Sequence, residues 1–128
     1  MKSASALSMA RVVRALQCPK KGLRGAWRDE AALHQELGLM LLLAPLTIWL
    51  PLPRLDTALL LSLMGLVLLV ELPNSGLEAV VDIASPECNA PAAKAKDCGS
   101  AAVFVAAVML GGTWLALAGP ALWSRLLH

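Results

Sequence analysis

The sequence has few of the residues from which catalytic and metal centres of soluble proteins are built. It contains no tyrosine, one phenylalanine, two histidines and three cysteines, which are Cys18, Cys88 and Cys98. Because the cysteines are odd in number and form no C-x-x-C pair, we expect neither a zinc site nor a disulfide framework. Glycine-rich phosphate loops of the types GxxxxGK[ST] and GxGxxG are also absent, so any nucleotide site must be built in another way.

Charge is scarce, and this scarcity limits the fold class. Only 16% of the 128 residues are charged, whereas 58% are hydrophobic, and the mean hydropathy is +0.67. A soluble domain of this length could not cover so much apolar surface with its own chain. Lipid or further copies of the chain must therefore cover part of it. The length allows a single domain, which we place at residues 1–128.

Three stretches without charge are typical of membrane-spanning helices. The first, Leu37–Pro53, is at the lower length limit for a span, the second, Thr57–Val70, leads into charged residues, and the third is Gly99–Ser124. At about 1.5 Å per residue the third easily crosses about 30 Å of hydrocarbon. We therefore expect an all-α membrane protein with spans at about residues 37–53, 57–84 and 99–122, the last two joined by a loop over Ser85–Asp97.

The segment before the first span is basic and amphipathic. We expect it to form a surface helix over about residues 10–36, interrupted near Pro19, with Trp27 at the membrane interface. An ordinary soluble helix packed on its neighbour is the alternative. Because acidic residues precede the apolar run near Leu37, we expect no signal peptide.

The basic residues are distributed unevenly, which predicts an orientation. Seven of the 11 precede the first span, Lys94 and Lys96 follow the second, and Arg54 and Arg125 fall on the opposite side. The positive-inside tendency then places the N-terminus and the second loop of this multi-pass chain in the cytoplasm. The cysteines fall on that same side, where they need not pair. The basic residues lack a soluble binding fold, so no nucleic-acid partner is expected.

The segment Val70–Asp82, VELPNSGLEAVVD, carries the polar residues of the second span. Four of them are spaced by three or four positions, which places them on one face of a helix. They are Glu71, Asn74, Glu78 and Asp82. Ionisable groups at membrane depth are costly to bury and mark a functional site by default. A soluble helix with a solvated acidic edge is the alternative interpretation.

Acidic and basic residues from other segments are expected at the same interface. Asp29 and Glu30 come from the N-terminal segment, and Lys96 and Asp97 come from the second loop. Oxygen ligands suit a hard cation such as Mg²⁺, which commonly accompanies phosphates. Phosphoryl transfer needs cations on the phosphates and a carboxylate that accepts the proton of the acceptor hydroxyl. The residue types at this interface are therefore compatible with phosphoryl transfer.

Three stretches in this order, with the spans between them, resemble a known family. They are Lys21–Glu36 (KGLRGAWRDEAALHQE), Val70–Asp82 and Ala95–Val103 (AKDCGSAAV). From Arg11 to Trp114 the chain is similar to the small integral-membrane diacylglycerol kinases of Gram-negative bacteria, relatives of the undecaprenol kinases. The resemblance implies an ATP- and Mg²⁺-dependent inner-membrane kinase that converts diacylglycerol into phosphatidic acid. It also implies a homotrimer whose active sites are shared between adjacent subunits.

The resemblance further implies roles for individual residues. Glu71 matches the general base, and Glu30 and Glu78 match the metal ligands. The residues that match the ATP site are Arg11, Cys18, Glu30, Asn74, Glu78, Glu87, Asn89, Lys96 and Asp97. The residues that match positions near the lipid are Arg11, Arg24, Trp27, Ala31, Gln35, Glu36, Glu71 and Ser100.

Three residues depart from the pattern of this family. Pro73, between Glu71 and Asn74, removes a backbone hydrogen bond and is expected to kink the second span. Asn89 stands where the family often has a histidine, and Cys18 stands where an aromatic residue often covers the nucleotide.

Two other functions remain open at this point. One is the same transfer to undecaprenol, since the choice of lipid depends on the shape of a pocket. The other is a non-catalytic three-span subunit or a small ion transporter. A transporter is expected to carry ionisable groups through the depth of the membrane, whereas these gather at one end of the second span. The pattern therefore favours a site at the interface.

Overall fold

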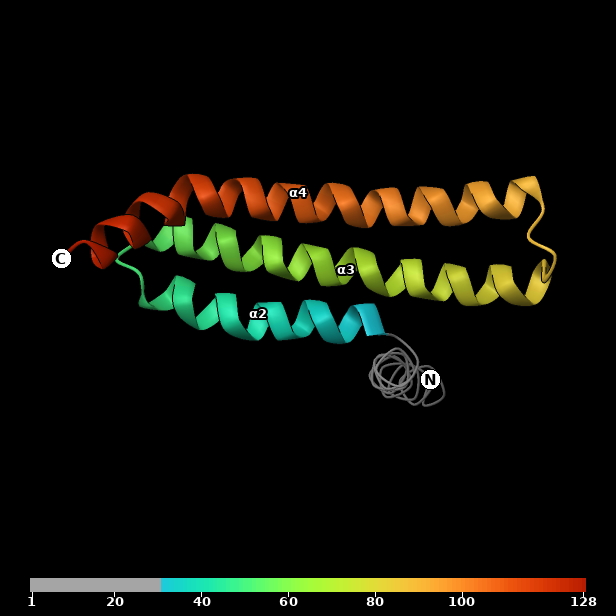
Figure 1. Ribbon diagram of the computed structural model, residues 1–128, viewed down its shortest axis with the longest axis horizontal. Helices are drawn as coiled ribbons and strands as arrows, with labels where there is room; N and C mark the ends of the chain where they lie inside the picture. Colours follow the sequence, from blue (N-terminus) through green and yellow to red (C-terminus); the bar gives the residue numbers. More distant parts are fainter. Residues whose placement is uncertain (1–30) are drawn as a thin grey trace, which may run out of the picture.

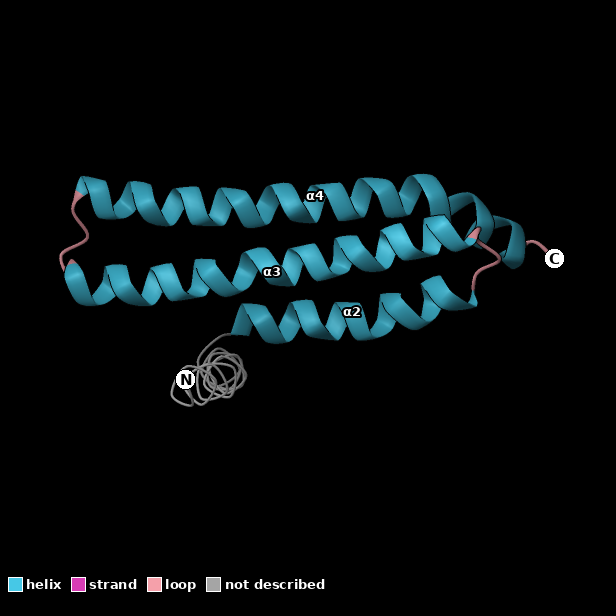
Figure 2. Cartoon of the chain, turned by 180° about the vertical axis from the view of Figure 1, so that it is seen from behind, coloured by secondary structure: helices cyan, strands magenta, loops and turns pink. Residues whose placement is uncertain are grey.

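The computed structural model describes residues 31–128, which form three helices. These are α2 (Ala31–Trp49), α3 (Arg54–Ala84) and α4 (Ala90–Leu126). Successive helices run in opposite directions, with α3 between the other two, and α2 begins beside the middle of α3 (Figure 1). Figure 2 shows the same arrangement from behind. The all-α prediction is thus confirmed for this part of the chain, while residues 10–30 of the expected surface helix lie outside the described residues.

The start of α4 differs from the prediction. We expected a loop over Ser85–Asp97, but α4 already begins at Ala90. Asn89 is its N-cap, and the Asn89 side chain accepts a hydrogen bond from the backbone N–H of Ala92 at 3.0 Å. Pro91 lies in the first turn, where its missing N–H has no helical partner to lose. Asn89 and Pro91 therefore begin a helix here instead of preventing one.

The start of α2 also differs from the prediction. Residues 31–36 were assigned to the surface helix, but they belong to the helix that carries the first apolar run. Pro45 and Pro73 lie inside α2 and α3, and both helices continue through them. Pro73 therefore does not separate Glu71 from Asn74 by a break in the helix. One continuous helix carries the whole polar segment.

Many large apolar side chains of the described residues are exposed. A core of Met40, Leu63, Val67 and Leu110 joins the three helices, but Leu41 on α2 remains 76% exposed, as do many like it. Helices α3 and α4 are long and apolar enough to cross a membrane, and α2 contributes a shorter apolar stretch from Leu33 to Trp49. An outward apolar surface on helices of this length is typical of a membrane protein.

One polar contact joins α2 to α4 within the apolar region. The indole N–H of Trp114 donates a hydrogen bond to Thr47 Oγ1 at 3.0 Å, and Thr47 Oγ1 donates to the carbonyl of Leu43 at 2.7 Å. The Thr47 side chain is fully buried. This contact satisfies a hydroxyl and an indole that would otherwise face apolar neighbours, so it fixes the position of α2 against α4.

We expect Trp114→Phe to lower the free energy of unfolding by about 0.5–1 kcal/mol, because it removes this hydrogen bond and keeps most of the ring. Equilibrium unfolding in detergent micelles measures the change. Trp123→Phe is the matched control, since Trp123 is 67% exposed. Equal effects of the two substitutions would show that the contact with Thr47 does not stabilise the helices.

Candidate active site

A cavity of about 630 Å³ lies among the three helices, in the half of α3 that carries the polar segment. Three carboxylates and an amide from α3 line it, together with one carboxylate from α2. The lining residues are Ala31, Glu36, Glu71, Asn74, Ser75, Glu78, Ala79, Asp82, Ser100 and Val103. The four residues that the helical spacing places on one face, from Glu71 to Asp82, do meet at one site.

Glu71 is the most enclosed acid of the cavity. It is only 4% exposed, and within residues 31–128 it is the one charged side chain in the buried class. Val67, four residues before it on α3, belongs to the apolar core. A carboxylate in such surroundings is far less solvated than one in water, so its interactions with neighbouring groups are strong.

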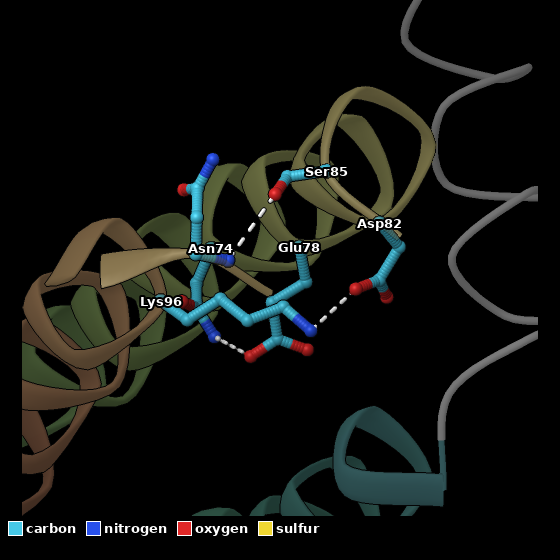
Figure 3. Close-up of polar contacts among 6 residues, drawn as sticks. Asn74, Glu78, Asp82, Ser85 and Lys96 are labelled. Carbon is cyan, nitrogen blue, oxygen red and sulfur yellow. Dashed lines mark hydrogen bonds and ion pairs between the residues drawn. The ribbon is translucent and has the colours of Figure 1, made fainter. Parts of the chain in front are cut away.

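Two polar contacts order the rest of the α3 face (Figure 3). The amide nitrogen of Asn74 donates a hydrogen bond to Glu78 Oε1 at 3.4 Å. One turn further, Lys96 of α4 reaches across to Asp82, and its Nζ lies 2.5 Å from Asp82 Oδ1. The hydrogen bond from Lys96, together with the charge of Asp82, raises the pKa of the Lys96 ammonium. Lys96 thus brings a permanent positive charge to the edge of an acidic cavity.

Glu36 supplies the carboxylate on the opposite wall, from α2, one position before the first predicted span. Burial raises the pKa of Glu36, and the nearby charge of Glu71 raises it further. Its Oε2 atom is buried and has no hydrogen-bond partner among the described residues. A hydroxyl donor or a cation beside Glu36 would therefore be stabilised by its carboxylate.

The donor chemistry of the cavity fits Mg²⁺ in the form in which it accompanies a nucleotide. Within residues 31–128 no three His, Cys, Asp or Glu side chains are close enough to enclose a metal ion by themselves. Mg²⁺ needs no such cage, because it usually keeps several waters and takes one or two carboxylates plus phosphate oxygens. Glu78 offers one carboxylate here, and Glu30, the other expected ligand, lies outside the described residues.

The structure brings together only some of the predicted site residues. Glu71, Glu78, Asn74, Ala31, Glu36 and Ser100 line the cavity, and Lys96 reaches its edge through Asp82. Four predicted residues have exposed side chains and do not line it, namely Gln35, Glu87, Asn89 and Asp97. Arg11, Cys18, Arg24, Trp27 and Glu30 lie outside the described residues.

The sequence predicted Asp82 on the polar face without an individual role, and it did not predict Ser75 as part of the cavity. Asp82 holds Lys96, and Ser75 is buried beside Glu71. Ser75 could have been found from the same helical spacing, because it follows Glu71 by four residues. The pairing of Asp82 with Lys96 could not, because it joins two helices.

The sequence matches the family model described as prokaryotic diacylglycerol kinase over residues 17–118. It is 41% identical to the diacylglycerol kinase of Escherichia coli (strain K12) over 115 residues, which cover 90% of this chain and 91% of that protein. It is 39% identical to the diacylglycerol kinase of Pseudomonas aeruginosa over 106 residues, covering 83% and 86%. The diacylglycerol kinase of Haemophilus influenzae is 38% identical over 94 residues, covering 73% and 80%. The chain therefore belongs to the prokaryotic diacylglycerol kinase family.

We expect Asp82→Asn to lower the pKa of Lys96, because the substitution removes the negative charge that favours the ammonium. At a fixed alkaline pH more of the Lys96 amine is then neutral, so it reacts faster with an acylating reagent. Mass spectrometry of peptides after brief labelling measures this rate, with the exposed Lys94 as internal reference. Asp97→Asn serves as the control, and equal Lys96 reactivity in the two variants would contradict the ion pair.

Proposed function

We propose that this protein is a lipid kinase that transfers the γ-phosphoryl group of ATP to diacylglycerol, with Mg²⁺, and so forms phosphatidic acid. The observation that carries the proposal is the buried carboxylate of Glu71 in a cavity that also holds Glu78 and Asn74. Membership of the prokaryotic diacylglycerol kinase family, whose relatives in Escherichia coli and Pseudomonas aeruginosa are named diacylglycerol kinase, supports the choice of reaction and acceptor.

Glu71 acts as the general base in this proposal. The lipid hydroxyl oxygen attacks the γ-phosphorus, its proton passes to a Glu71 carboxylate oxygen, and the bond to the ADP oxygen breaks. Because the carboxylate is withdrawn from water, it accepts the proton without competing solvent. Glu36, on the facing wall, lies where it can orient the acceptor hydroxyl toward the base.

The remaining polar residues bind the nucleotide. Glu78 and Glu30 would hold Mg²⁺, which supplies charge neutralisation on the phosphates when bound. Lys96 provides a cation for the phosphates once it leaves Asp82, and Asn74 keeps the Glu78 carboxylate in place. Cation and carboxylate on neighbouring helices are the arrangement that phosphoryl transfer needs, since its catalysis is mostly positioning and charge stabilisation.

We place the enzyme in the bacterial inner membrane as a homotrimer with its N-terminus in the cytoplasm. The uneven distribution of basic residues supports this orientation, and the exposed apolar side chains of all three helices are compatible with lipid and with further copies of the chain. The cavity then lies at the cytoplasmic end of α3, where ATP from the water and a lipid from the bilayer can meet.

One assay tests the reaction and the acceptor together. Purified protein in mixed micelles receives labelled ATP and Mg²⁺ with either diacylglycerol or undecaprenol, and labelled lipid product is counted. We expect transfer to diacylglycerol. Preferred transfer to undecaprenol would overturn the choice of acceptor, and no transfer to either lipid would overturn the kinase function.

We expect Glu71→Gln to fold and to bind ATP but to lose at least about 10²-fold in kcat, because an amide cannot accept the proton. Turnover at saturating ATP and lipid measures the loss. Asp56→Asn is the matched control, since Asp56 lies in the first turn of α3, far along the helix from the cavity. Near-normal turnover of Glu71→Gln would exclude Glu71 as the base.

We also expect sites that are shared between subunits. If Glu30 and Glu71 of one site come from different chains, a mixture of inactive Glu30→Gln and inactive Glu71→Gln subunits will contain some sites with both native residues. Unfolding and refolding the two variants together should then restore part of the activity, whereas mixing without subunit exchange should not. A complete lack of restored activity after exchange would place each site within one chain.

A further inference from the structure

Gly99 of α4 packs directly against the side chain of Asn74 on α3. A Cβ atom at Gly99 would lie 3.2 Å from Asn74 Cγ and would clash with Asn74 Oδ1. Among the glycines of residues 31–128 this is exceptional, because a Cβ at Gly38, Gly76 or Gly112 would meet no neighbouring atom within 4 Å. The absence of a side chain at Gly99 therefore gives the Asn74 amide its space.

The Asn74 amide packs against Gly99 through its oxygen and makes a hydrogen bond through its nitrogen. Its Oδ1 atom is buried and has no hydrogen-bond partner among the described residues, while its Nδ2 atom donates to Glu78 Oε1 at 3.4 Å. An amide group is planar and rigid, so the position of its oxygen determines the direction of its N–H bonds. An atom that displaces Oδ1 therefore displaces Nδ2 as well, and the hydrogen bond from Nδ2 to Glu78 is already long at 3.4 Å.

We propose that Gly99 is a positioning residue, which by leaving room for the Asn74 amide fixes the orientation of the Glu78 carboxylate in the cavity. The inference rests on the proposed function, in which Glu78 binds the metal ion of the nucleotide. Residues that orient a metal ligand through a hydrogen bond commonly change metal affinity by roughly 10- to 100-fold when they are altered. Gly99 does not contact the proposed metal ligand Glu78 itself, but it acts on Glu78 through Asn74.

The test compares Gly99→Ala with Gly112→Ala on the same helix. Alanine is a better helix former than glycine, so neither substitution weakens α4 through helix propensity. The Cβ of Gly112→Ala meets no described atom, whereas that of Gly99→Ala displaces Asn74. Two quantities are measured for the full-length protein in micelles: binding of Mn²⁺ with a non-hydrolysable ATP analogue, by electron paramagnetic resonance, and the Mg²⁺ concentration for half-maximal turnover.

We expect Gly99→Ala to weaken Mn²⁺ binding and to raise the Mg²⁺ requirement by roughly 10-fold or more, with Gly112→Ala unchanged. The variant Asn74→Ala removes the amide and so makes room for a Cβ at position 99. Adding Gly99→Ala to Asn74→Ala should therefore cause no further loss of Mn²⁺ affinity and no lower unfolding temperature. This second comparison decides the question even if Gly99→Ala alone fails to assemble.

Two results would overturn the inference. One is equal Mn²⁺ affinity of Gly99→Ala and Gly112→Ala, and the other is a further loss when Gly99→Ala is added to Asn74→Ala. Both are distinct from failure of the proposed function, which appears as absence of lipid phosphorylation in the unsubstituted protein. If the unsubstituted protein turns over normally and Gly99→Ala and Gly112→Ala bind Mn²⁺ equally well, the kinase function stands and only the role of Gly99 is refuted.

Discussion

The burial of one carboxylate in an apolar helix is the constraint on which the rest of this structure depends. Glu71 is 4% exposed, and isolated burial of a charge is prohibitively costly. Glu71 lines a cavity together with Glu36, Asn74 and Glu78, and in the proposed function this cavity admits the hydroxyl group that Glu71 deprotonates. All three helices contribute to that cavity: α2 supplies Glu36, α3 supplies its polar face, and α4 supplies Ser100 and Val103.

The sequence predicts those features of the fold that depend on one helix alone, namely where the helix lies in the chain and which residues share one of its faces. The charge-free runs predicted α3 and α4. The spacing from Glu71 to Asp82 predicted that these polar residues lie on one face, and they do line one cavity. The predicted loop to Asp97 was wrong because proline and asparagine both end and begin helices, and only the N-cap hydrogen bond from Ala92 to Asn89 distinguishes the two cases.

Contacts between different helices could not be predicted from the sequence. Lys96 was assigned to the nucleotide by resemblance, but its pairing with Asp82 depends on how far α4 is shifted along α3. The same shift brings Gly99 against Asn74. The contact of Trp114 with Thr47 depends in the same way on the position of α4 relative to α2. Periodicity defines the faces of one helix, whereas the relative shift of two helices follows from the shapes of many packed side chains.

The division of α3 into an apolar half and a polar half has a consequence for biosynthesis. The run Thr57–Val70 contains seven leucines, each of which favours membrane insertion, whereas a carboxylate opposes insertion more strongly the deeper it lies. The leucines therefore offset the cost of Glu71 while α3 enters the bilayer, before α2 and α4 pack against it. A polar substitution on the lipid-facing side of this run would not touch the cavity. It would still weaken the membrane insertion of α3, so that fewer chains reach the membrane with Glu71 at the depth that the site requires.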